Sequence, residues 1–178
     1  MVAKEQMLTE AKNDNQPEAS GITYRAIDHI ALAVIDLEAA VHLFTVMLGF
    51  TLIRRRHTKG AKTGMYSAEL ENGSMKFVLC QGTEPESQVS RLVSEYGPGV
   101  AHIALEVDDV TKTVDELGAR GMRFDTSVIE GPGLTQAFTA RDANTGLSFE
   151  LIKRSGEQGF VDGNIQALFD QLEQSDSY

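Results

Sequence analysis

The chain has 178 residues, of which 42% are apolar and 24% charged, and its formal net charge is −10. This composition is typical of a globular protein that can build a core of its own. A strongly acidic surface repels nucleic-acid phosphates and anionic lipids, so we expect neither a nucleic acid nor a membrane as the main partner. No apolar run approaches the roughly 20 residues that a membrane-spanning helix needs.

The first 21 residues are polar and show no hydrophobic periodicity. We interpret residues 1–21 as a flexible tail without the apolar segment of a secretion signal, and we therefore expect a cytoplasmic protein. Residues 22–178 are interpreted as one domain.

Within that domain the sequence repeats itself at an offset of 73 residues. Residues 29–34 read HIALAV and residues 102–107 read HIALEV, so that five of six positions match. In each copy an aspartate, Asp36 or Asp109, then precedes apolar residues spaced as one face of a helix. A repeat of this length indicates two copies of one strand–helix unit.

Each copy continues into three extended runs, which we interpret as strands. They cover residues 50–56, 66–71, 75–80, 122–128, 136–141 and 148–153. The two modules, residues 24–83 and 97–155, therefore both read βαβββ. We expect an α+β fold in which two tandem modules form one curved, mostly antiparallel sheet around a metal site.

The end of the chain predicts a C-terminal helix over residues 163–173. Ile165, Leu168, Phe169 and Leu172 share one helical stripe there. This helix either packs across the sheet and closes the pocket or lies on the outer surface, and the pattern alone favours neither.

Three metal-binding side chains occupy related positions in the two modules. Strand residues alternate between faces, so His29 shares its face with Ala31, and His102 shares its face with Ala104. These small neighbours leave room beside each imidazole. Glu150 lies within an apolar strand, where a carboxylate is costly unless it is paired or metal-bound. One such residue alone is more often structural, but three at related positions of a duplicated fold predict a metal site.

The repeat also indicates the kind of metal site. Subtracting the offset from Glu150 gives Phe77, so the fourth position of a symmetric site is predicted to be apolar. Two histidines and one carboxylate form the facial triad of non-haem Fe(II) enzymes, which leaves coordination positions open for substrate and O₂. Zn²⁺ is an alternative because three protein ligands plus water also describe a catalytic zinc site. Mn²⁺ and Co²⁺ are further alternatives.

Four other reactive side chains do not fit this pattern. His42 lies within the first predicted helix and His57 follows a run of arginines, so we expect both to face solvent. Cys80 is the only cysteine and lies in an apolar run, which favours a buried, unreactive thiol. Glu106 shares a strand face with His102 and is the obvious candidate for a general base, although a surface carboxylate is the simpler interpretation.

Five blocks of sequence, in this order along the chain, carry a family resemblance. They are EPESQV (84–89), GPGVAHIAL (97–105), QAFT (136–139), FELIKR (149–154) and GFVDGNIQALF (159–169). With the duplicated module they resemble the vicinal-oxygen-chelate superfamily, and in particular the catalytic C-terminal domain of 4-hydroxyphenylpyruvate dioxygenase.

The resemblance implies that His29, His102 and Glu150 bind Fe(II), and that a 2-oxo acid chelates the metal beside O₂. It also implies substrate-binding residues. The polar contacts are Ser67, Gln88 and Gln136, Phe138 stacks on a substrate ring, and Asn164 belongs to the closing helix. No catalytic residue is implied beyond the metal ligands.

Three functions are compatible with these observations. The leading hypothesis is an Fe(II)-dependent dioxygenase that acts on a small 2-oxo acid or another oxygen chelator. The second is a metal-dependent epimerase, isomerase or lyase of the glyoxalase type, which needs a base that works near neutral pH. The third is a resistance protein that binds a small molecule without turnover. We also expect a homodimer, because a partner commonly covers the edge strands of a small open sheet.

Overall fold

The structure is a computed structural model that describes residues 21–131 and 133–156. Residues 1–20 of the predicted tail, the predicted helix over residues 163–173 and its Asn164 lie outside the described residues.

The described residues form one curved sheet of eight strands in the order β2-β3-β4-β1-β5-β8-β7-β6. Their bounds are β1 Tyr24–Ala33, β2 Thr51–Lys59, β3 Gly64–Asn72, β4 Met75–Gly82, β5 Gly99–Val107, β6 Ile129–Gly131, β7 Leu134–Phe138 and β8 Phe149–Arg154. The pairs β1·β4 and β5·β8 are parallel, and the other neighbouring pairs are antiparallel. The predicted α+β class and mostly antiparallel sheet are confirmed.

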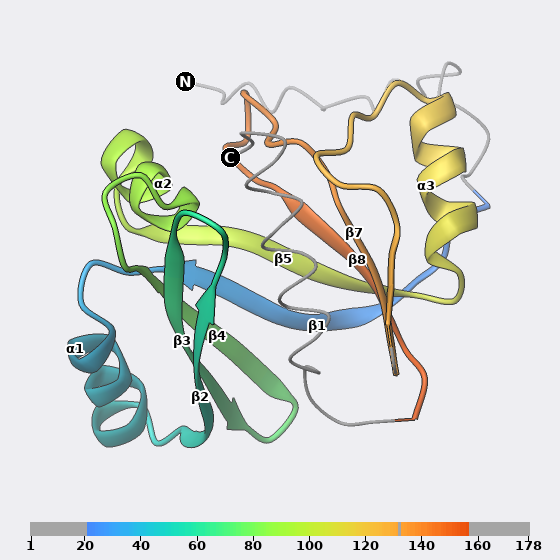
Figure 1. Ribbon diagram of the computed structural model, residues 1–178. Coiled ribbons are helices and arrows are strands. Elements are labelled where there is room, and N and C mark those ends of the chain that lie inside the picture. Colours follow the sequence, from blue (N-terminus) through green and yellow to red (C-terminus); the bar gives the residue numbers. More distant parts are fainter. Residues whose placement is uncertain (1–20, 132, 157–178) are drawn as a thin grey trace, which may run out of the picture.

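The strand order is symmetric about its centre, as the sequence repeat requires. β1 and β5, the two strands that carry the HIAL motif, run antiparallel side by side through the middle of the sheet (Figure 1). Ala31 pairs with His102, and His29 pairs with Ala104. This register relates the two halves by a pseudo-twofold axis and brings both histidines to the centre of the sheet.

Two helices, one from each module, cover the sheet on the face opposite His29 and His102. α1 (Leu37–His42) continues into a π-helical turn, η1 (Leu43–Met47), and α3 (Val110–Ala119) is the matching helix of the second module. Asp36 and Asp109 cap these helices in the same way, accepting hydrogen bonds of 2.9 Å from the backbone N–H groups of Ala39 and Lys112. No helix in the described part of the chain is long and apolar enough to cross a membrane.

Each of these helices packs an apolar face on the strands of its own module. Leu37, Val41 and Phe44 pack with Leu70 and Leu79 in the first module. In the second module the corresponding cluster is Val107, Val110, Leu117, Ala137 and Leu151. Burying these side chains supplies the main favourable term in folding, so each helix stabilises its own module.

Two local predictions need correction. Residues 122–128 form no strand; Phe124 makes one isolated bridge to Thr139, and β6 begins only at Ile129. The reason is that the backbone N–H of Phe138 donates to the hydroxyl of Thr126, at 2.9 Å, in place of a backbone carbonyl. A side-chain hydroxyl thereby replaces one of the backbone acceptors with which a regular strand would pair. The strand predicted over residues 136–141 likewise begins earlier and ends at Phe138.

The sequence analysis also missed helix α2 (Gln88–Tyr96), which joins the two modules. Its N-terminus is capped by Ser87, whose hydroxyl accepts a hydrogen bond from the backbone N–H of Ser90 at 3.2 Å. The helix lies directly against the end of β4. A side chain at Gly82 would collide with the hydroxyls of Ser87 and Ser90, so glycine is required for this close approach.

Candidate metal centre

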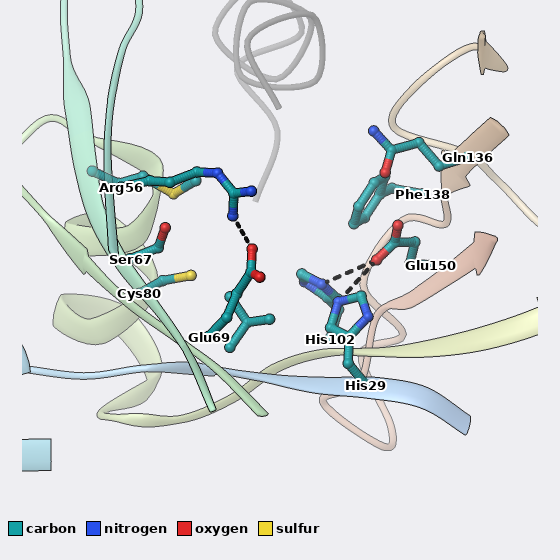
Figure 2. Close-up of a pocket in the computed structure, with 11 residues that line it drawn as sticks. His29, Arg56, Ser67, Glu69, Cys80, His102, Gln136, Phe138 and Glu150 are labelled. Carbon is teal, nitrogen blue, oxygen red and sulfur yellow. Dashed lines mark hydrogen bonds and ion pairs between the residues drawn. The ribbon is translucent and has the colours of Figure 1, made fainter. Parts of the chain in front are cut away.

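Three side chains from three neighbouring strands converge on one point of the concave face (Figure 2). His29 comes from β1, His102 from β5 and Glu150 from β8. The Nε2 atoms of His29 and His102 lie 3.2 and 3.4 Å from Oε2 of Glu150. One ligand atom from each residue lies within 4.8 Å of the others. Two imidazole nitrogens and one carboxylate oxygen at this separation can hold one divalent ion.

His29 is held in place by a second layer of charged residues. Its Nδ1 atom lies 2.8 Å from Oδ1 of Asp28. Arg154 in turn donates two hydrogen bonds to the Asp28 carboxylate, of 2.6 and 2.7 Å. A carboxylate on Nδ1 favours the tautomer that carries its proton there, so Nε2 faces the centre with a free lone pair.

The pKa values of the triad show how strongly its charges interact without a metal. Burial lowers the pKa of His29, but the charge of Glu150 and the hydrogen bond to Asp28 outweigh burial and raise the value to about 9. Burial raises the pKa of Glu150, but the charge of His29 and hydrogen bonds from both histidines lower it to about 2. Burial lowers the pKa of His102. Without a metal, His29 and Glu150 therefore form a buried ion pair, while His102 is neutral.

The fourth position of the pseudo-symmetric site is filled by valine. In β1·β4, Ile30 pairs with Phe77 and Ala31 with Val78; in β5·β8, Ile103 pairs with Phe149 and Ala104 with Glu150. The structural counterpart of Glu150 is therefore Val78, and the assignment to Phe77 from the repeat was wrong by one residue. The 73-residue offset changes between the first and last strands because the connecting segments differ in length. The prediction of an apolar fourth position stands, because Val78 lines the pocket.

Most of the predicted substrate residues reach the pocket that surrounds the triad. Ser67, Gln136 and Phe138 line it, and the ring of Phe138 lies edge-on to His102 with centroids 5.1 Å apart. Gln88 is buried at the first position of α2 but is not among the lining residues. The structure thus brings together three of the five predicted residues, places Gln88 outside the pocket lining, and does not describe Asn164.

A scan against known protein families decides the affiliation of the chain. Residues 26–151 match the model described as "Glyoxalase/Bleomycin resistance protein/Dioxygenase superfamily". The chain belongs to this superfamily. The match covers both modules, from β1 to β8, and confirms the resemblance inferred from the sequence.

Several proteins that are similar to this chain carry the names of enzymes. 4-Hydroxyphenylpyruvate dioxygenase of Legionella pneumophila is 30% identical, over 90% of this chain and 57% of its own length. A mutant 4-hydroxymandelate synthase from Streptomyces coelicolor superposes with a TM-score of 0.77 at 24% identity, over 91% of this chain and 58% of that one. A methylmalonyl-CoA epimerase from the same species, bound to 2-nitronate-propionyl-CoA, gives 0.64 at 24% identity, over 75% of this chain and all of that one. The chain thus spans little more than half the length of the first two, and the structural matches show the shared fold.

The remaining reactive residues lie where the sequence analysis placed them. His42 and His57 are exposed, and His57 lies against Tyr66 with ring centroids 4.3 Å apart. Glu106 is partly buried but is not among the residues that line the pocket around the triad. Cys80 is buried, and burial raises the pKa of its thiol to about 12. It nevertheless forms part of the pocket wall, which its apolar surroundings in the sequence did not indicate.

Sequence reasoning missed several residues around the centre. Asp28 and Arg154 brace His29, whereas Arg56, Glu69 and Val78 form part of the opposite wall. Glu69 did leave a signal, because it lies two positions after Ser67 and so shares its strand face. The others left none. Ala101 stands where the second copy would repeat Asp28, so the repeat itself does not mark that residue.

Proposed function

We propose that this protein is a non-haem Fe(II)-dependent dioxygenase that oxidises a small, metal-chelating 2-oxo acid with O₂. His29, His102 and Glu150 hold the ion in this proposal. The observation that carries it is the triad of two nitrogens and one oxygen within 4.8 Å, in which His29 and Glu150 are buried, with apolar Val78 at the fourth position. A site with three protein ligands leaves positions for both a chelating substrate and O₂. Several curated relatives are named 4-hydroxyphenylpyruvate dioxygenase, which supports the same chemistry.

The residues fit a resident Fe(II) ion. The Glu150 side chain is fully buried, with both imidazoles turned toward the same carboxylate oxygen. A buried carboxylate in this position is stabilised either by a protonated histidine or by a cation that replaces the proton. The Asp28–Arg154 pair keeps the same tautomer of His29 in both cases.

When bound, Fe(II) supplies a common template for the two reactants and the electrons that activate O₂. The chain supplies the surroundings. Glu150 contributes one negative charge, so a triad loaded with a divalent ion carries a net positive charge that attracts the carboxylate of a 2-oxo acid. Phe138 and Val78 provide apolar surface beside the centre, which keeps water away from the reacting atoms.

The polar lining residues are proposed to position the substrate. Ser67 and Gln136 occupy equivalent places in the two modules, because Ser67 pairs with Cys80 two residues beyond Val78, and Gln136 pairs with Ile152 two residues beyond Glu150. They approach the pocket from opposite sides (Figure 2) and can donate hydrogen bonds to substrate oxygens. Gln88 and Asn164 are proposed as contacts on the family resemblance alone.

An epimerase, isomerase or lyase is the second candidate, favoured by the fold shared with methylmalonyl-CoA epimerase. Such an enzyme needs a base beside the metal-bound substrate. Among the described lining residues, Glu69 is the one carboxylate besides Glu150, and Glu69 is ion-paired with Arg56. A carboxylate neutralised in this way is a weak base, so the dioxygenase is the better-supported proposal.

Oxygen uptake by Fe(II)-loaded protein, prepared without air, tests the proposal against a panel of alkyl and aryl 2-oxo acids. We expect uptake coupled to CO₂ release, and loss of both in His102→Ala. His42→Ala is the matched control, because it removes an exposed histidine far from the pocket lining.

The alternatives give different results in the same samples. Exchange of a substrate C–H hydrogen with D₂O, without oxygen uptake, would establish the epimerase or isomerase class. Tight binding of a small molecule with neither uptake nor exchange would point to a binding protein.

A further inference from the structure

The pocket wall opposite the triad carries a buried ion pair. Arg56 on β2 donates to the carboxylate of Glu69 on β3, and their side chains are only 8% and 11% exposed. Both residues line the same pocket as the triad. Figure 2 shows the pair on the side of the first module, facing His29, His102 and Glu150.

The pair lies where a metal-bound substrate extends. The three proposed ligands come from β1, β5 and β8, so a substrate that bound an ion held there would have the opposite wall, formed by β3 and β4 with Val78, beside it. A substrate chelated at one end therefore points its other end toward Arg56 and Glu69. The rest of that wall is largely apolar, since Met65, Val78 and Cys80 also line it.

The fold itself does not require charges here. The pairings of β3·β4 and β7·β8 make Glu69 the counterpart of Phe138, and the pairings of β2·β3 and β6·β7 make Arg56 the counterpart of Ile129. The second module thus fills the same two positions with an aromatic and an aliphatic side chain. Replacing a buried ion pair by apolar residues of similar size is often neutral or stabilising. Stability alone therefore does not explain the pair.

The chemistry of the pair selects the group that fits against it. A hydrocarbon end would remove this ion pair further from water and offer it no hydrogen bond in exchange, which is unfavourable. A second carboxylate would face Arg56 but also the negative charge of Glu69. A neutral group with both a donor and an acceptor can donate to Glu69 and accept from Arg56 without adding charge.

From this geometry we infer that Arg56 and Glu69 form a distal substrate subsite, selecting 2-oxo acids that end in a neutral primary carboxamide, which can donate to Glu69 and accept from Arg56. The inference rests on the proposed function, because metal chelation fixes the near end of the substrate. Arg56 and Glu69 are then specificity-determining residues that touch the substrate away from the reacting atoms.

Calorimetric titration of Co(II)-loaded protein under argon tests this subsite without turnover. The probes are 2-oxo acids that share one frame, straight-chain or phenyl, and differ only at the far end, as carboxamide, carboxylate or isopropyl. These three ends are similar in size and shape. We expect the carboxamide to bind about tenfold more tightly than either of the others, the effect of leaving one buried polar group unsatisfied.

Two variants sharpen the test. In the double variant Arg56→Met with Glu69→Leu, which mimics the apolar second module, the isopropyl compound should bind most tightly. In Glu69→Gln, where Arg56 is no longer neutralised, the carboxylate should bind most tightly. Thermal unfolding and metal content confirm that each variant is folded, and the single variant answers the question if the double variant does not fold.

The outcomes separate the two proposals. If no 2-oxo acid binds, or if binding does not depend on the metal, the proposed function fails. If the acids bind through the metal but the wild-type protein prefers the isopropyl or the carboxylate end, the subsite inference alone is overturned. An order of affinities that stays the same in both variants would also overturn it.

Discussion

Binding of a divalent ion to the triad should release about one proton per chain at neutral pH. Without the ion, the pKa of His29 is raised from 6.5 to about 9, so at pH 7 this residue must lose a proton before it can ligate. The pKa of His102 and that of Glu150 are both lowered, so these residues are already in their ligating forms.

The size of the effect follows from the gap between the pH and the pKa of His29. Well below that pKa each pH unit lowers the apparent metal affinity about tenfold, and His29 is half protonated at pH 9, so the affinity at pH 7 should be about fiftyfold lower than at pH 9. The stability of the metal-free protein should change in the opposite direction. A pKa raised from 6.5 to about 9 stabilises the fold fully below pH 6.5, by about 3 kcal/mol, and this contribution is lost as the pH rises through 9.

The lowered pKa of Glu150 describes the other side of the same ion pair. Its contribution is present above pH 4.5 and is lost as the pH falls through about 2. The metal-free protein should therefore be most stable between about pH 4.5 and 6.5 as far as this pair is concerned. The two contributions are not added, because they report one interaction.

Calorimetry with Zn²⁺ in buffers of different ionisation enthalpy counts the released protons, and chemical unfolding of the metal-free protein from pH 6 to 9 measures the stability change. His42→Ala should behave as the wild type, because His42 is exposed on α1. A metal affinity that does not change between pH 7 and 9, with no proton released, would refute the assignment of His29 as a ligand with a raised pKa.

Three further predictions concern residues around the triad. Asp28→Asn should weaken metal binding about 10- to 100-fold, because it removes the carboxylate that orients His29. It should also lower the melting temperature, because Arg154 loses its charged partner. Metal titrations that match the wild type would contradict this. Val78→Gln places a neutral ligand at the counterpart of Glu150, so metal should bind more tightly while oxygen uptake falls, and undiminished uptake would argue against an open position there. The thiol of Cys80, with its pKa raised to about 12, should react with iodoacetamide at pH 8 far more slowly in the native than in the urea-unfolded protein, and equal rates would show that it is not buried.

The sequence predicted most of the fold because the duplication is visible in it. The HIAL motif marked β1 and β5, and Asp36 and Asp109 marked the start of the helices that follow. The failures came from side chains that replace backbone partners. Thr126 interrupts a segment with the apolar pattern of a strand, and the capping role of Ser87 went unrecognised, so α2 was missed.

The proposed metal ligands could be selected from sequence because His29 and His102 occupy the same position of the repeated motif and Glu150 interrupts an apolar strand. Their surroundings could not, because those contacts join residues far apart in the chain. Arg154 reaches Asp28 across 126 positions, and the strand pairings, not the repeat, made Val78 the counterpart of Glu150. The roles of the predicted substrate residues, the identity of the metal and the homodimer stay predictions.

The most direct test of the central claim is the iron content of protein dialysed against Fe(II) without air, compared among the wild type and three single alanine variants of His29, His102 and Glu150. We predict one ion per chain in the wild type and in the His42→Ala control, and none in any of the three variants when each is shown to be folded. Iron that remains bound in the folded variants, or a folded wild type that binds none, would contradict the proposed metal centre.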